Sequence, residues 1–268
     1  MSSIVEDKKQ ASTSEENVKN IIEVKGVNKI YSSSTIALQD VNLNIKEKEF
    51  VSFVGPSGCG KSTLMRIIAG LGDVTSGHVS VLGTTPQIAR QQKGEVAFVF
   101  QEATLLPWRN IMRNVGLPLE ISGVPSKERI QRGERVLELV GLKDHMYAMP
   151  NELSGGMKMR VSIARALIAN PKLLIMDEPF GALDEITRQN LQHELLDIWK
   201  QEELTVLFVT HNVFESVYLS NRTVVMTPRP GEIASVVDVD LPHPRHDDLR
   251  TSQRYGELVA QVSESLKH

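Results

Sequence analysis

One glycine-rich stretch carries residues whose types and spacing could bind a polyphosphate. "GPSGCGKST" matches Gly-x-x-x-x-Gly-Lys-Ser/Thr and lies between a strand-like and a helix-like stretch. This context predicts a loop whose backbone N–H groups face phosphate oxygens. Lys61 would supply a charge to the β- and γ-phosphates, and Ser62 a hydroxyl to Mg²⁺. A glycine-rich turn without a ligand is the alternative. The predicted nucleotide-binding residues here are Gly55, Pro56, Ser57, Gly58, Cys59, Gly60, Lys61, Ser62 and Thr63.

Two adjacent acids could complete a hydrolytic site. Asp177 and Glu178 end the apolar stretch "LLIM", which reads as a strand. Because successive side chains on a strand point to opposite faces, the two carboxylates can have different roles. Asp177 is placed to hold the metal ion, and Glu178 is the candidate general base for the attacking water. The alternative is a solvated acidic pair in a loop.

Two further polar residues follow apolar stretches in the same way. His211 ends "LTVLFVT", and Gln101 directly follows "VAFVF". Ligands of open α/β sheets gather at the carboxyl ends of the strands. We therefore expect His211 to reach the γ-phosphate and the attacking water, and Gln101 to contact metal and water. A lone histidine is more often structural, which remains the alternative for His211.

The elements that must position these residues follow from the hydrophobic pattern. Residues 20–31 alternate apolar and polar side chains, as a strand does. "STLMRIIAGL" predicts a helix with Leu64, Ile67, Ile68 and Leu71 on one face. Residues 96–100 predict a short buried strand. Helical patterns dominate residues 104–169, and strand patterns then return, so we expect an α/β core interrupted by a helical insertion.

Composition narrows the class of protein. The 268 residues, with 41% hydrophobic and 24% charged side chains, are typical of a globular chain. The formal net charge of −3 offers no overall attraction for nucleic acid, and we expect no nucleic-acid partner. Cys59 is the only cysteine, which excludes an internal disulfide.

The ordered set of motifs resembles a known family. "GPSGCGKST", "FQE", "LSGGM", "LLIMDEP", "GALD" and "FVTH" follow one another as in the ATP-binding subunit of an ABC transporter. "EATLLPWRN", "FGALDEITR" and "TPRPG" are similar to the nitrate/sulfonate/taurine (bicarbonate) importer group. Met157 stands where many family members have Gln, and Met is frequent in this group. The resemblance implies a P-loop NTPase: a RecA-like α/β core with an antiparallel β subdomain and an inserted α-helical subdomain. It also implies ATP hydrolysis with Mg²⁺.

The resemblance also implies roles for residues outside the phosphate loop. Tyr31 matches the aromatic residue that stacks on adenine. Ser154, Gly155 and Gly156 match the signature that closes over the γ-phosphate of a partner's ATP. Asp184 matches the loop that contacts the opposing subunit. These roles imply a head-to-tail dimer, formed by two copies or by this chain and a related ATPase subunit.

The family further implies partners and a location. We expect integral membrane permease subunits, an indirectly coupled extracytoplasmic substrate-binding protein, and a peripheral position on the cytoplasmic face of the cell membrane. Trp108 and Arg109 in "LLPWRN" are the candidate docking surface; the alternative is that Trp108 forms the core of the insertion. A soluble single-cassette ABC-type ATPase, acting as an assembly or mechanical factor, is the competing function.

The chain is expected to divide into three parts. Residues 1–19 form a disordered leader, and residues 20–230 form the ABC ATPase domain with the helical insertion at about 102–163. Residues 231–268 form a C-terminal extension with a packed helix, because Leu258, Val259, Val262 and Leu266 recur at helical spacing.

Overall fold

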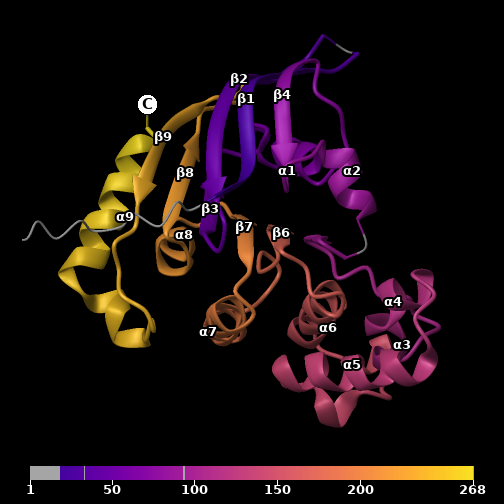
Figure 1. The fold of residues 1–268 in the computed structure, drawn as a ribbon. Helices are drawn as coiled ribbons and strands as arrows, with labels where there is room; N and C mark the ends of the chain where they lie inside the picture. The colour runs from indigo at the N-terminus through magenta and orange to yellow at the C-terminus, as the bar shows by residue number, and fades with distance from the viewer. Residues whose placement is uncertain (1–18, 33, 93, 268) are drawn as a thin grey trace, which may run out of the picture.

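Two β-sheets organise the chain. The computed structural model describes residues 19–32, 34–92 and 94–267 (Figure 1). Most of the predicted leader therefore lies outside the described residues. The α/β class predicted from the sequence is confirmed, since strands and helices alternate along most of the chain.

The smaller sheet is antiparallel and the larger one mainly parallel. The smaller has the order β2-β1-β4, with β1 (Asn20–Ile30), β2 (Ile36–Lys46) and β4 (Ser76–Val81). The larger has the order β5-β6-β7-β3-β8-β9, and only β9 runs antiparallel to its neighbour. Its strands are β3 (Phe50–Val54), β5 (Val96–Val99), β6 (Leu173–Asp177), β7 (Thr205–Val209), β8 (Arg222–Met226) and β9 (Ile233–Asp238).

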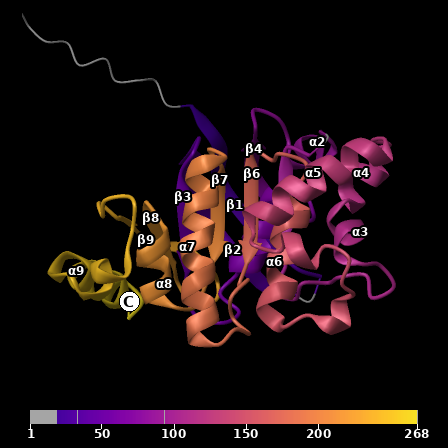
Figure 2. The ribbon, with the colours of Figure 1, turned by 90° about the horizontal axis from the view of Figure 1, so that it is seen from below.

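The helices lie at the two ends of the molecule, beneath the larger sheet and between the two sheets. Helices α3–α6 gather at one end of the molecule and α9 lies at the other, in both views (Figures 1 and 2). The α-helices are α1 (Lys61–Ile68), α2 (Pro86–Gln91), α3 (Ile111–Val115), α4 (Leu117–Ile121), α5 (Ser126–Leu139), α6 (Gly155–Leu167), α7 (Glu185–Gln201), α8 (Val213–Leu219) and α9 (Gln253–Ser265). Short 3-10 turns lie at Lys143–His145, Pro150–Glu152 and Asp247–Thr251.

Two local expectations were wrong for identifiable reasons. Helix α1 ends at Ile68, so Leu71 is 45% exposed instead of extending the apolar face. Gly70 follows with φ +67°, a left-handed conformation that stops a helix. Strand β5 is only partly buried, and Phe100 beyond it is 41% exposed. It is an edge strand, which composition alone could not indicate.

The segment after residue 230 is joined to the core. Strand β9 pairs with β8 and so extends the large sheet. Helix α9 packs against α8 and β9 and buries Tyr255, Leu258, Val259 and Val262. Among the helices of the described residues, none has the length and apolar character needed to cross a bilayer.

Candidate functional site

The loop between β3 and α1 has a backbone that requires glycine at two positions. Gly58 and Gly60 have φ values of +76° and +106°. A Cβ at Gly60 would also lie 2.7 Å from the carbonyl oxygen of Ala37. This curled loop leads directly into α1, so its backbone and the positive N-terminal end of the helix form one surface. Such a surface favours phosphate oxygens.

Lys61 lies inside this loop. Its Nζ donates hydrogen bonds to the carbonyl oxygens of Gly55 at 2.7 Å and Pro56 at 3.1 Å, and the residue is only 5% exposed. The ammonium group is thus held by neutral acceptors, for which a phosphate would be a stronger replacement. Cys59 is 1% exposed and packs within the loop.

Ser62 and Asp177 meet across two elements. The hydroxyl of Ser62, on α1, donates to Oδ1 of Asp177, at the end of β6, at 3.0 Å. Burial raises the pKa of Asp177 above its ordinary value, and the Ser62 hydrogen bond opposes this shift. A hydroxyl and a carboxylate side by side are the hard oxygen donors that Mg²⁺ prefers. The residues therefore fit the predicted metal ion.

Glu178 and His211 form a second pair at the same edge of the sheet. Nδ1 of His211, after β7, lies 3.5 Å from Oε2 of Glu178, after β6. Glu178 has φ +48°, and its N–H donates to the carbonyl oxygen of Val209 at 3.0 Å. A left-handed conformation is uncommon for glutamate and costs about 1 kcal/mol. The strands thus fix the backbone of Glu178 at this edge of the sheet.

Gln101 and Tyr31 lie near different parts of the site. A Cβ added at Gly181, in the turn after Glu178, would lie 3.6 Å from Nε2 of Gln101. Tyr31, 44% exposed after β1, has its hydroxyl 3.2 Å from Oγ1 of Thr63 on α1. Its ring is thus available beside the phosphate loop.

The predicted signature lies on different elements from the phosphate loop. Ser154 caps α6, and its Oγ accepts a hydrogen bond from the N–H of Met157 at 3.3 Å. A Cβ at Gly156 would lie 2.5 Å from Cγ2 of Thr187 on α7, and one at Gly155 would lie 3.9 Å from Leu183. The start of α6 therefore packs against the start of α7.

Asp184 caps α7 beside this signature. Its Oδ1 accepts from the N–H of Thr187 at 3.0 Å, and this hydrogen bond holds the pKa of Asp184 below its ordinary value. The structure thus brings Lys61, Ser62, Asp177, Glu178, His211 and Gln101 to one edge of the large sheet. Ser154, Gly155, Gly156 and Asp184 form a separate group around the N-termini of α6 and α7.

Two neighbours of the phosphate loop were not predicted from the sequence. Arg229 donates from Nε and Nη2 to the carbonyl oxygen of Gly58, at 3.3 and 3.2 Å. A Cβ at Gly231 would lie 1.9 Å from the carbonyl oxygen of Cys59. The turn between β8 and β9 therefore packs on the loop. The only sequence signal was the Arg-Pro-Gly turn itself, 171 residues after Gly58.

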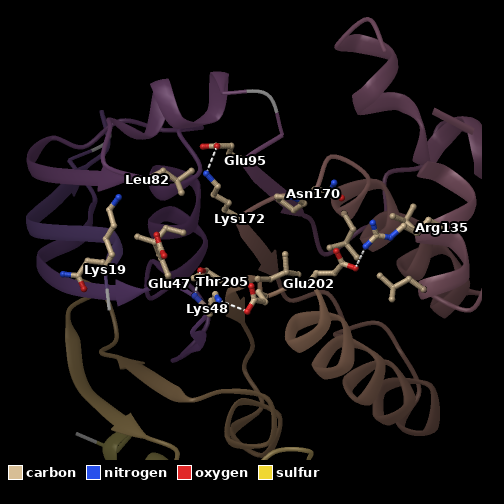
Figure 3. A pocket seen from close by; sticks show the side chains of 18 residues that line it. Lys19, Glu47, Lys48, Leu82, Glu95, Arg135, Asn170, Lys172, Glu202 and Thr205 are labelled. Atoms are coloured by element: carbon tan, nitrogen blue, oxygen red, sulfur yellow. Dashed lines mark hydrogen bonds and ion pairs between the residues drawn. The ribbon is translucent and has the colours of Figure 1, made fainter. Parts of the chain in front are cut away.

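A pocket at the opposite edge of the sheet carries none of the predicted site residues. Its volume is about 400 Å³, and it is lined by residues that precede β3, β5, β6 and β7 (Figure 3). Six of its charged groups form ion pairs: Lys48 with Glu203, Lys172 with Glu95, and Arg135 with Glu202. It is thus separate from the candidate site at the carboxyl ends of the strands.

Comparison with known proteins identifies the family. Residues 38–181 match the model of the family described as ABC transporter. The chain is 46% identical to the uncharacterized ABC transporter ATP-binding protein MJ0412 of Methanocaldococcus jannaschii, over 94% of this chain and 90% of the relative. It is 39% identical to the aliphatic sulfonates import ATP-binding protein SsuB of Bacillus thuringiensis, over 92% and 96%.

A solved structure supports the same assignment. The dimeric ATP-binding cassette MJ0796, in a post-hydrolysis state bound to ADP and Pi, superposes with a TM-score of 0.73 at 33% identity. The match covers 82% of this chain and all of the cassette. The fold is therefore the P-loop NTPase fold of an ABC cassette, as predicted. This chain belongs to the ABC transporter family as an ATP-binding subunit, and it is an ATPase.

Proposed function

We propose that this chain is the ATP-hydrolysing subunit of an importer for a small anion of the nitrate, sulfonate, taurine or bicarbonate type. ATP hydrolysis is supported by two observations at the site: the contact between Ser62 and Asp177, and the neighbouring pair of Glu178 and His211. The similarity to sulfonate import subunits supports the importer and the class of solute. The motif "LLPW" supports the same group.

The residues at the sheet edge have distinct proposed tasks in hydrolysis. The loop N–H groups and Lys61 bind the β- and γ-phosphates. Ser62, Asp177 and Gln101 would hold Mg²⁺, which would supply positive charge to the phosphate oxygens when bound. Glu178 accepts a proton from the water whose oxygen attacks the γ-phosphorus, and the products are ADP and phosphate.

His211 and Tyr31 have supporting tasks in the same proposal. His211, 3.5 Å from Glu178, orients the attacking water and the γ-phosphate. Tyr31 stacks on adenine from its position beside Thr63, a contact that contributes a few kcal/mol at most. Together they fix the two ends of the nucleotide relative to the phosphate loop.

A dimer would complete each site. The hydroxyl of Ser154, the N–H groups of Gly155 and Gly156 and the positive end of α6 form a second phosphate-binding surface. This surface and Asp184 would face the ATP held by a partner's Lys61. ATP then stabilises the closed dimer, and loss of the γ-phosphate reopens it, because the nucleotide has different affinities for the two states. The dimeric cassette MJ0796 supports this arrangement.

The helical insertion is the proposed docking site for integral membrane permease subunits. Trp108 is 70% exposed and Tyr147 73% exposed, which argues against Trp108 as core of the insertion. They border a cavity of about 590 Å³. Glu120, paired with Arg109 at 2.7 Å and Arg129 at 3.1 Å, lies in its wall. An apolar rim with fixed charges suits a short helix of a permease.

Detergent extraction and ligand binding test the proposal. An importer subunit on the cytoplasmic face should copurify with integral membrane proteins from solubilised membranes, and Trp108→Ala should weaken that association. Recovery only from the cytosol, without a membrane partner, would favour the competing soluble assembly ATPase. The substrate-binding protein recovered with the same complex should bind small anions, and its preference for another class would refute the proposed solute.

A further inference from the structure

A buried polar chain links the C-terminal segment to the loop that carries His211. Arg250, in the 3-10 turn before α9, donates from Nη2 to Oε1 of Gln192 on α7 at 2.6 Å. Nε2 of Gln192 donates to Oε1 of Glu215 on α8 at 2.9 Å. The hydroxyl of Thr210, after β7, donates to the other carboxylate oxygen of Glu215. Gln192, Glu215 and Thr210 are 2%, 5% and 3% exposed.

At the Thr210 end of this series of hydrogen bonds, the backbone on both sides of His211 is fixed. Thr210 precedes His211, and its Oγ1 accepts from the N–H of Asn212 at 3.0 Å. Oδ1 of Asn212 accepts from the N–H of Glu215 at 3.2 Å and so caps α8. His211, Glu178, Thr210 and Glu215 also line one small cavity. The position of His211 therefore depends on where Glu215 holds its neighbours.

At the other end of the series, Arg250 and its neighbours in the C-terminal segment are held firmly in place. The guanidinium of Arg250 lies 3.5 Å from the centre of the Tyr218 ring. Arg245, 4% exposed, donates to backbone carbonyl oxygens of Val217, Tyr218 and Ser220 at the end of α8. The segment is thus attached to the same helix that carries Glu215, and Arg250 has a defined place.

Arg250 sets the direction of the Gln192 amide. Both oxygens of Glu215 accept hydrogen bonds, so the carboxylate needs the NH₂ of Gln192 and not its oxygen. Because Arg250 has donors only, it keeps the amide oxygen of Gln192 on its own side. Without Arg250 the amide oxygen of Gln192 loses its charged donor, and Glu215 alone fixes the amide. A hydrogen bond to a buried carboxylate weakens when the donating group is held less firmly, so Thr210 and the His211 loop become less firmly placed.

We propose that Glu215 is a positioning residue for His211, and that Arg250 makes the C-terminal segment part of this support. The inference rests on the proposed roles of Glu178 and His211 in hydrolysis. It assigns to the segment after residue 240 an effect on turnover, exerted through Gln192 and Glu215. Nucleotide binding, which uses the phosphate loop, should be almost independent of it.

Steady-state kinetics of the full-length chain test this. Arg250→Met should lower kcat for MgATP about threefold to tenfold, the range expected for one lost hydrogen bond, while KM changes less than twofold. Arg250→Lys keeps a donor and should retain at least half of the activity. The matched control is Arg254→Met in the same segment, because Arg254 is paired with Asp240 and takes no part in the hydrogen bonds from Arg250 to Thr210. Its kcat should equal that of the wild type.

A double variant tests whether Arg250 and Glu215 act on kcat through the same series of hydrogen bonds. Glu215→Gln should lower kcat about tenfold. Adding Arg250→Met should lower kcat little further, because both substitutions interrupt the same series of hydrogen bonds and their effects are not additive. If Arg250→Met is too unstable to assay, Gln192→Met interrupts the same chain and should give the same loss. Equal kcat in wild type and Arg250→Met, an equal loss in Arg254→Met, or multiplicative losses in the double variant would overturn the proposal.

Glu178→Gln in the same assay separates this proposal from the proposed function. If Glu178→Gln abolishes turnover while Arg250→Met retains it, only the positioning role fails. If Glu178→Gln turns over like the wild type, the hydrolytic assignment fails and the positioning role falls with it.

Discussion

A methyl group added at Gly156 should clash with the start of α7. The Cβ of Gly156→Ala would lie 2.5 Å from Cγ2 of Thr187. Carbon atoms in contact prefer about 3.5–4.0 Å, so one helix must shift by roughly 1 Å. Thr187 is branched at Cβ, and its backbone N–H is fixed by Asp184 at 3.0 Å. The shift therefore cannot be absorbed by a flexible side-chain end.

The expected change in the free energy of unfolding of Gly156→Ala follows from two opposing contributions. Overpacking of this kind costs about 1–3 kcal/mol, and exchanging Gly for Ala in a helix returns at most about 1 kcal/mol. We expect Gly156→Ala to lower the free energy of unfolding by about 1–2 kcal/mol. Thr187→Ser removes Cγ2 and keeps the N–H that Asp184 accepts, so the double variant should recover most of this loss.

Urea unfolding of the three variants measures these free energies. The matched control is Gly256→Ala in the first turns of α9, where a Cβ would have no heavy atom within 4 Å. This control should be neutral or slightly stabilising. Wild-type stability of Gly156→Ala, or no recovery with Thr187→Ser, would refute the described packing of α6 on α7. ATPase activity should be lost and recovered in parallel if the start of α6 binds phosphate as proposed.

Three further changes have defined outcomes. Lys61→Ala should weaken ATP binding by tenfold or more in titration calorimetry, since it removes the ammonium group held in the phosphate loop; unchanged affinity would contradict this. Glu178→Gln should bind ATP yet lose steady turnover and elute as a dimer with ATP, whereas persistent turnover would refute its role as base. Burial, together with Arg245 and Lys200, lowers the pKa of His243 from 6.5 to about 4. The unfolded chain then binds a proton that the native chain does not. Stability should therefore fall as the pH falls from 6.5 towards 4, by about 1–2 kcal/mol at pH 5. His243→Leu should reduce this loss in urea titrations, and parallel curves for the two proteins would count against it.

The sequence predicted the residues of the sheet edge because they obey a local rule. Lys61, Asp177, Glu178 and His211 each follow a short apolar stretch or a glycine loop. The carboxyl ends of parallel strands meet at one edge, and β6, β7 and β3 are indeed neighbours. The order of the strands itself was not predicted, and it did not need to be for these residues to meet.

Contacts that depend on packing between distant elements could not be predicted. Arg229 on the phosphate loop and Arg250 on Gln192 are separated from their partners by 171 and 58 residues. Arg229 lies in the motif "TPRPG", but this motif does not indicate which residue the arginine binds, and no motif marks Arg250. Their partners are a backbone carbonyl and an amide, which any surface arginine could bind. Only the positions of β9 and α9 select these partners.

The same distinction supports the proposal that one chain supplies only part of a hydrolytic site. The residues of the phosphate loop and of the sheet edge converge because the sheet joins their strands. Gly155 and Gly156 instead lie against Leu183, which precedes α7, and Thr187, on α7. The N–H groups at the start of α6 have no intrahelical acceptors. A phosphate supplied by a second molecule would satisfy these donors without moving α6 within its own chain. The fixed packing of α6 on α7 thus favours assembly of two chains over internal closure as the route to a complete site.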